Sequence, residues 1–92
     1  MNNHPHIVKR DGHKEAYDNH KVHTTVYRAC KNSHLEEGRC NEVAEKVRDS
    51  VDQWMADKEK ISAQELFEKI AGEIRDHDND AAFLYATHRD IS

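Results

Sequence analysis

Three basic side chains near the N-terminus have the spacing expected of an anion-binding site. Lys9 and Arg10 are adjacent and are followed by Asp11-Gly12, while Lys21 lies in the first turn of a predicted helix. Adjacent lysine and arginine side chains can make charge-assisted hydrogen bonds to phosphate oxygens, and a helix N-terminus favours an anion. A cation in that first turn opposes the helix macrodipole, so it is easier to explain if it binds phosphate. The alternative is an exposed basic strand and helix without a ligand.

The distribution of charge along the chain favours a compact anionic ligand. The 92 residues carry a net charge of −4. The first 34 residues hold six Lys or Arg against three Asp or Glu, whereas the rest hold eight against fifteen. A small basic end attracts a compact anion, and the acidic remainder would repel an extended nucleic-acid backbone. We therefore do not expect nucleic acid as a partner, and the alternative is an imbalance with no partner at all.

The eight histidines and two cysteines offer metal ligands, but not at the spacing of a typical site. Structural zinc usually needs four ligands in two close pairs, whereas Cys30 and Cys40 stand apart with only His34 between them. His20 and His23 are one helical turn apart without a carboxylate motif around them. Nucleophile elbow, phosphate loop and dinucleotide fingerprint are also missing. We expect neither a metal centre nor catalytic residues, and a His-rich metal-binding protein is the weakest alternative.

A short hairpin must position the basic residues. Residues 6–10 are β-prone, and the Asp-Gly pair after them predicts a two-residue turn with both residues at positive φ. The return strand would cover residues 13–17. An isolated two-stranded hairpin is marginal in water, so it must lie on another part of the domain. Asp18 then predicts the N-cap of the first helix.

Apolar residues at three- and four-residue spacing predict a helical core. The first helix runs from Asp18 to a polar break at residues 31–34. The apolar positions of the second helix are Cys40, Val43, Ala44, Val47, Val51, Trp54 and Met55. The third helix begins at Ser62, where Glu65 completes a capping box, and a short final helix begins at Ala81. The predicted fold is mainly α: four helices capped by a small N-terminal β-hairpin.

Length and composition exclude several classes of protein. Ninety-two residues allow one small domain, which we place at residues 6–92 after a flexible N-terminus of residues 1–5. The longest apolar run falls short of the ~18–20 residues that cross a bilayer, and the first residues do not resemble a signal peptide. Two cysteines without a secretion signal favour reduced thiols. We therefore expect a cytoplasmic domain without a membrane partner.

One ordered motif is more specific than these patterns. Residues 8–12 read Val-Lys-Arg-Asp-Gly, residues 15–18 read Glu-Ala-Tyr-Asp, and Lys21-Val22 follows. This order resembles the opening of the ATP-cone domain, with Tyr17 for the usual Phe and Val22 for Ile. Residues 61–66 resemble the start of the family's third long helix. Residues 85–91 resemble its closing motif, one residue shorter and with His88 and Ile91 in place of aromatic residues.

The resemblance implies a regulatory nucleotide-binding module of the kind found in ribonucleotide reductase large subunits and in the repressor of their genes. The ligand would be ATP or dATP with Mg²⁺, bound beneath the hairpin. The basic positions would bind phosphates, the aliphatic and aromatic positions would flank adenine, and the acidic positions would contact base or sugar. The expected site comprises Val8, Lys9, Arg10, Glu15, Tyr17, Asp18, Lys21 and Val22.

The implied role is that of an allosteric sensor rather than an enzyme. Nucleotide binding would control association of the chain with itself, or with a larger regulated protein such as ribonucleotide reductase. Two of the site residues have simpler alternatives: Glu15 could be a cross-strand partner of Lys9 or Lys14, and Asp18 could serve as a helix cap alone. The alternative for the whole chain is a helical protein–protein interaction module with a degenerate nucleotide site.

Overall fold

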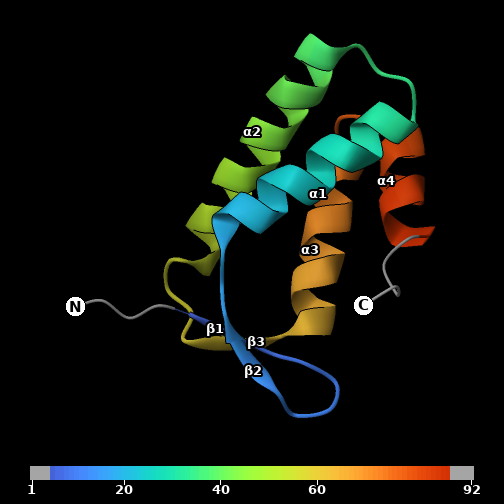
Figure 1. Ribbon diagram of the computed structural model, residues 1–92. Coiled ribbons are helices and arrows are strands. Elements are labelled where there is room, and N and C mark those ends of the chain that lie inside the picture. The colour runs from blue at the N-terminus through green and yellow to red at the C-terminus, as the bar shows by residue number, and fades with distance from the viewer. Residues whose placement is uncertain (1–4, 88–92) are drawn as a thin grey trace.

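The computed structural model describes residues 5–87. The elements follow the order β1 (His6–Val8), β2 (Lys14–Ala16), α1 (Asn19–Asn32), α2 (Glu37–Met55), β3 (Lys60–Ser62), α3 (Ala63–Arg75) and α4 (Asn79–Thr87). The helices form a bundle, and the short strands lie together at one end of it (Figure 1). The predicted fold, mainly α with an N-terminal hairpin, is confirmed. Most of the predicted flexible N-terminus and the last residues of the closing motif lie outside the described range.

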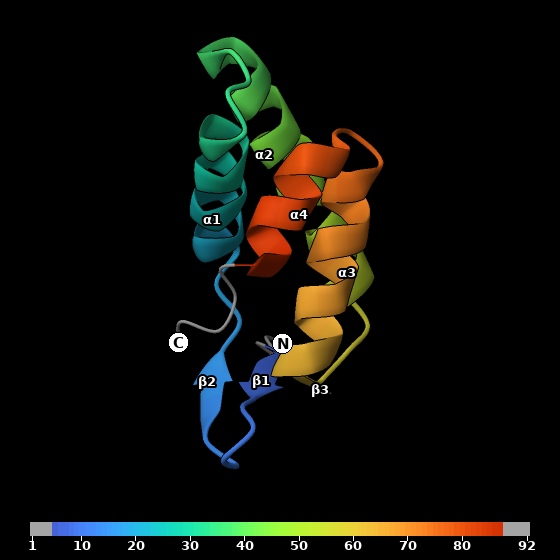
Figure 2. The ribbon, with the colours of Figure 1, turned by 90° about the vertical axis from the view of Figure 1, so that its right-hand side faces the viewer.

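The core is formed by the predicted apolar faces of the helices. α1 and α2 lie side by side, and α4 packs against both α1 and α3 (Figures 1 and 2). None of the described helices combines the length and apolar character that spanning a bilayer requires. The buried helical side chains are Val22, Val26, Ala29, Cys30, Cys40, Val43, Ala44, Val47, Val51, Met55, Ile70, Ala71, Ile74, Ala81 and Ala82.

Trp54 lies at the edge of this core rather than within it. Val51 and Met55, one turn apart on α2, take the central buried positions, and Trp54 is half-buried beside them. The ammonium groups of Lys58 and Lys69 lie 4.6 Å and 5.6 Å from the centroid of its ring. Such cation–π contacts suit an aromatic ring that is partly open to water. The apolar spacing predicts Trp54 in the core together with the other apolar positions of α2, whereas the structure leaves it half-buried at the edge.

The hairpin is supported by a third strand that the sequence did not predict. The sheet has the order β2-β1-β3, with β1 antiparallel to β2 and parallel to β3. Val8 is therefore paired with Lys14 on one side and with Ser62 on the other. β3 runs directly into α3, so the hairpin lies on the start of that helix (Figure 2). This arrangement meets the requirement that the hairpin rest on another part of the domain.

The hairpin loop has three residues, not two. Lys9 donates its N–H to the carbonyl of His13 over 2.7 Å, and Gly12 donates to the carbonyl of Lys9 over 2.8 Å. Gly12 has φ +89°, whereas Asp11 does not adopt positive φ and instead accepts from the His13 N–H over 2.9 Å. Three-residue hairpin loops end in one such left-handed residue. Arg10 therefore lies in the loop rather than at the end of a strand.

Candidate functional site

The start of α1 faces the hairpin and is capped as predicted. The Asp18 carboxylate accepts from the N–H of His20 over 3.0 Å. Lys21 follows in the first turn, which contains no acidic side chain. The unsatisfied N–H groups of a helix start carry partial positive charge, and here a lysine adds to it. This end of α1 is therefore suited to an anion.

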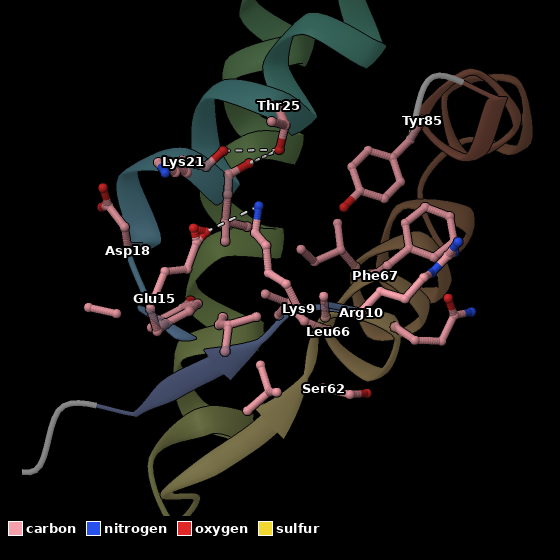
Figure 3. Close-up of a pocket in the computed structure, with 18 of the residues that line it drawn as sticks. Lys9, Arg10, Glu15, Asp18, Lys21, Thr25, Ser62, Leu66, Phe67 and Tyr85 are labelled. Carbon is pink, nitrogen blue, oxygen red and sulfur yellow. Dashed lines mark hydrogen bonds and ion pairs between the residues drawn. The ribbon is translucent and has the colours of Figure 1, made fainter. Parts of the chain in front are cut away.

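A cavity of about 1460 Å³ lies between the hairpin, α1, α3 and α4 (Figure 3). It is larger than the ~300–1,000 Å³ of most small-molecule sites, so it has room for a nucleoside triphosphate. Each residue of the expected site lines it: Val8, Lys9, Arg10, Glu15, Tyr17, Asp18, Lys21 and Val22. The sequence did not predict the other contributors, which include Thr25, Arg28, Ser62, Gln64, Leu66, Phe67 and Tyr85.

The sheet brings the start of α3 to the same cavity as the start of α1. Because Val8 is paired with Ser62, the chain leaves β1 at Lys9 beside the first turn of α3. The Ser62 side chain accepts from the Glu65 N–H, and the Glu65 carboxylate accepts from the Ser62 N–H, each over 3.0 Å. The predicted capping box is thus confirmed, and Ser62 and Gln64 line the cavity. The N-termini of α1 and α3 therefore both lie at the cavity, which favours a negatively charged ligand.

The three predicted phosphate-binding cations surround the cavity from different sides. Lys9 reaches into it and forms an ion pair with Glu15, with 3.6 Å between the ammonium nitrogen and the carboxylate oxygen. Arg10 extends toward Phe67 on α3, and Lys21 lies on the side of Asp18 (Figure 3). The cross-strand pairing considered for Glu15 is therefore observed. It leaves both partners on the cavity wall, partly exposed and able to contact a ligand.

The predicted base-flanking residues form one wall of the cavity. Val22 is buried, whereas Val8 and Tyr17 are half-buried. The Tyr17 hydroxyl donates to the Asp52 carboxylate on α2 over 2.7 Å. Burial, the hydrogen bond to Asp52 and its negative charge raise the pKa of Tyr17 above its ordinary value. The ring of Tyr17 is therefore available to the cavity while its hydroxyl is not.

A second apolar wall lies across from this one, and the sequence did not predict it. Phe67 of α3 and Tyr85 of α4 stack with their ring centroids 5.3 Å apart and their planes 17° apart. Leu66 is half-buried beside them and also lines the cavity. Helical spacing places Leu66 and Phe67 on the apolar face of α3, but it does not distinguish a side chain in the core from one on a cavity wall.

The two cysteines lie in the core. Cys30 and Cys40 are both free thiols and fully buried. Burial and the neighbouring Cys40 raise the pKa of the Cys30 thiol to about 11, and burial also raises the pKa of Cys40. Nucleophilic and metal-binding cysteines act as thiolates, which this environment disfavours. Within residues 5–87 there is no group of three or more His, Cys, Asp or Glu that could hold a metal ion.

Comparison with known proteins identifies the family of this chain. The ATP cone domain family matches residues 5–91. The chain is also similar to the transcriptional repressor NrdR of Carboxydothermus hydrogenoformans, with 24% identity over 90 residues. This match covers 94% of the chain and 57% of the repressor, so the chain spans little more than half the length of that relative. Such a domain implies a nucleotide-binding regulatory module. The chain belongs to the ATP-cone domain family.

Proposed function

We propose that this chain binds ATP or dATP in the cavity beneath the hairpin and acts as a nucleotide-dependent regulatory sensor. One observation carries the proposal: the motif residues and the starts of two helices meet around a single cavity. Family membership supports the nucleotide, since ATP-cone domains bind adenine nucleotides. The arrangement of charge supports a triphosphate over a neutral ligand.

The phosphates would occupy the end of the cavity where the hairpin loop meets the two helix starts. Lys9, Arg10 and Lys21 supply positive charge from three sides of this space. We propose that the nucleotide binds with Mg²⁺, because this ion keeps several waters and is held largely by the phosphates themselves. A dedicated cluster of protein carboxylates is therefore not required.

The purine base would lie against the aliphatic and aromatic wall. Val8, Tyr17 and Val22 give that wall its apolar surface. The carboxylates of Glu15 and Asp18 lie beside it and would accept hydrogen bonds from the base or the sugar. An apolar lining with a few directed polar groups is typical of small-molecule sites.

Occupancy of the site would control association of the chain with itself or with a larger regulated protein in the cytoplasm. The relative named above is a transcriptional repressor of which this chain matches only part. Ribonucleotide reductase is a second candidate for the regulated protein, because the motif of residues 8–22 resembles the domain found there. In either case, the hairpin and the start of α1 would transmit occupancy, because they form one side of the cavity.

A thermal-shift titration tests the proposal directly. A ligand that binds only the folded state stabilises it by about 2.7 kcal/mol at a hundredfold excess over Kd. In a domain this small, that corresponds to a rise in Tm of roughly 10 °C or more. We expect ATP and dATP with Mg²⁺ to produce this shift, CTP to produce little, and inorganic triphosphate to produce a weak shift that salt removes.

Two outcomes would contradict the proposal. Equal shifts from all four ligands would indicate a nonspecific anion-binding surface. No shift from ATP or dATP at millimolar concentration would favour the helical interaction module instead. Light scattering on the same samples would show whether binding changes the size of the assembly, which tests the regulatory part separately.

A further inference from the structure

Asp52 of α2 holds the segment that joins β2 to α1. The Tyr17 hydroxyl donates to Asp52 Oδ1 over 2.7 Å, and the Asn19 side-chain amide donates to Asp52 Oδ2 over 2.9 Å. These two donors flank Asp18, the N-cap of α1. A single carboxylate on α2 therefore fixes the chain on both sides of the point where strand changes to helix.

The contact with Asp52 determines how the Tyr17 ring meets the cavity. The ring lines the cavity and packs against the core, whereas the hydroxyl points to Asp52. A hydrogen bond from a hydroxyl to a carboxylate is short and stronger than one between neutral groups. The ring therefore keeps this bond in one orientation only. In that orientation the hydroxyl points away from a ligand in the cavity, and the apolar surface of the ring faces the ligand.

The hydrogen bonds to Asp52 are separate from the apolar packing of α1 against α2. Those helices are joined by fully buried side chains such as Val26 and Val47. Tyr17 and Asn19 belong to the entry of the helix, which is more exposed. Losing the bonds to Asp52 should therefore loosen the entry of α1 without opening the core.

We propose that Asp52 is a positioning residue for the nucleotide site, holding Tyr17 and the start of α1 in the orientation that binds the ligand. This inference rests on the proposed function. Asp52 does not itself line the cavity, so it acts through Tyr17 and through Asn19 beside the helix cap. It links α2, which otherwise belongs to the core, to the occupancy of the site.

The test compares Asp52→Ala with Asp49→Ala, a matched change on the exposed side of the same helix. Asp49 is 70% exposed and pairs only with its neighbour Arg48 among the described contacts. Calorimetry with Mg-ATP gives Kd, and thermal melting of the free chain gives its stability. Without these two bonds, ligand binding must also order Tyr17 and the start of α1, so Asp52→Ala should raise Kd about tenfold, which corresponds to about 1.4 kcal/mol. We expect Asp49→Ala to leave both Kd and Tm close to those of the wild type. Asp52→Ala loses two hydrogen bonds to a charged group in the free chain, so its Tm should fall by roughly 5–10 °C while the chain still folds.

A spectroscopic measurement follows the contact itself. Tyrosine ionisation is recorded by ultraviolet absorbance at alkaline pH, with Tyr17→Phe to identify the contribution of Tyr17 among the three tyrosines. We expect Tyr17 to resist ionisation in the wild type and to ionise at lower pH in Asp52→Ala. Tyr17→Phe keeps the ring but lacks the hydroxyl, so it should also raise Kd. Its effect and that of Asp52→Ala should not add in the double variant.

The outcomes separate this inference from the proposed function. ATP binding by the wild type with unchanged Kd in both Asp52→Ala and Tyr17→Phe would overturn the inference alone. Absence of ATP binding by the wild type would overturn the proposed function, and this inference with it. If Asp52→Ala fails to fold, Tyr17→Phe decides: an unchanged Kd overturns the inference, and a raised Kd supports it.

Discussion

The two sides of α1 face surroundings of opposite character. One side presents Val26 and Cys30 to the core, where both are fully buried. The other side presents Lys21 and Arg28 to a cavity that remains open to water. The buried side is held by close apolar packing, and the cavity side is held by caps, ion pairs and three short strands. Stability and ligand binding should therefore respond to different substitutions, although the residues involved are neighbours on one helix.

Substitution in the core should have the largest effect on stability. Ile74 is fully buried on α3, so Ile74→Ala removes apolar contacts and leaves a cavity, at a cost of about 2–5 kcal/mol. Urea unfolding monitored by circular dichroism measures this loss. Phe83→Ala is the control, because Phe83 is 69% exposed and its loss should cost less than about 0.5 kcal/mol. Equal losses from both changes would show that the core is not where the structure places it.

Removal of the loop cations should affect ligand binding instead. The variant Lys9→Ala/Arg10→Ala should lose most of the ~2.7 kcal/mol that saturating ATP contributes. The free chain should unfold at nearly the same urea concentration as the wild type, because an exposed pair such as Lys9–Glu15 contributes only about 0–1 kcal/mol. If the free variant unfolds, these side chains hold the hairpin together. Stability and ligand binding would then depend on the same residues.

Substitution of Trp54 should affect stability less than substitution of a core residue and more than substitution of the loop cations. Since its ring is half-buried and covered by two lysines, Trp54→Ala should cost about 1–3 kcal/mol, less than for a fully buried aromatic. Thermal unfolding followed by circular dichroism gives this value, since the variant lacks the tryptophan fluorescence. A loss above about 4 kcal/mol would place the ring inside the core after all.

The smallest effect is expected at the start of α3, where one residue both caps the helix and lines the cavity. Ser62→Ala breaks the capping box and should cost about 1 kcal/mol. Because Ser62 also lines the cavity, the variant should weaken ATP binding slightly as well. Glu68→Gln on the exposed side of α3 is the control. Its amide oxygen can still accept from Gln64, as the Glu68 carboxylate does, so it should change neither quantity. A loss of stability in the control as large as in Ser62→Ala would argue against the cap.

The helices and their caps could be predicted because they depend on residues close together in the sequence. Asp18 and Ser62 each satisfy N–H groups within three residues, and the spacing of apolar positions identifies each buried face. The motif of residues 8–22 likewise predicted residues that share one cavity. What such local patterns omit is the long-range pairing of the strands.

The features that the sequence missed each depend on contacts between distant segments. β3 is only three residues long and is stabilised by pairing with β1, so no periodic pattern reveals it. Phe67 is recognisable as apolar, but its place on a cavity wall depends on where α4 brings Tyr85. The loop was predicted one residue too short, because Asp-Gly also fits a three-residue loop in which only Gly12 needs positive φ.

The parallel pairing of Val8 with Ser62 has a consequence for the order in which the molecule folds. These residues are about 54 positions apart in the sequence, so closing that contact in an unfolded chain is entropically slow. The contacts within the α1–α2 pair span a much shorter stretch and should form first. The sheet would then complete the structure late, once α2 has brought β3 back to the hairpin. A folding intermediate with helices but no sheet would lack the ligand site. Nucleotide would therefore not accelerate the early steps of folding, and it would stabilise the chain by slowing its unfolding.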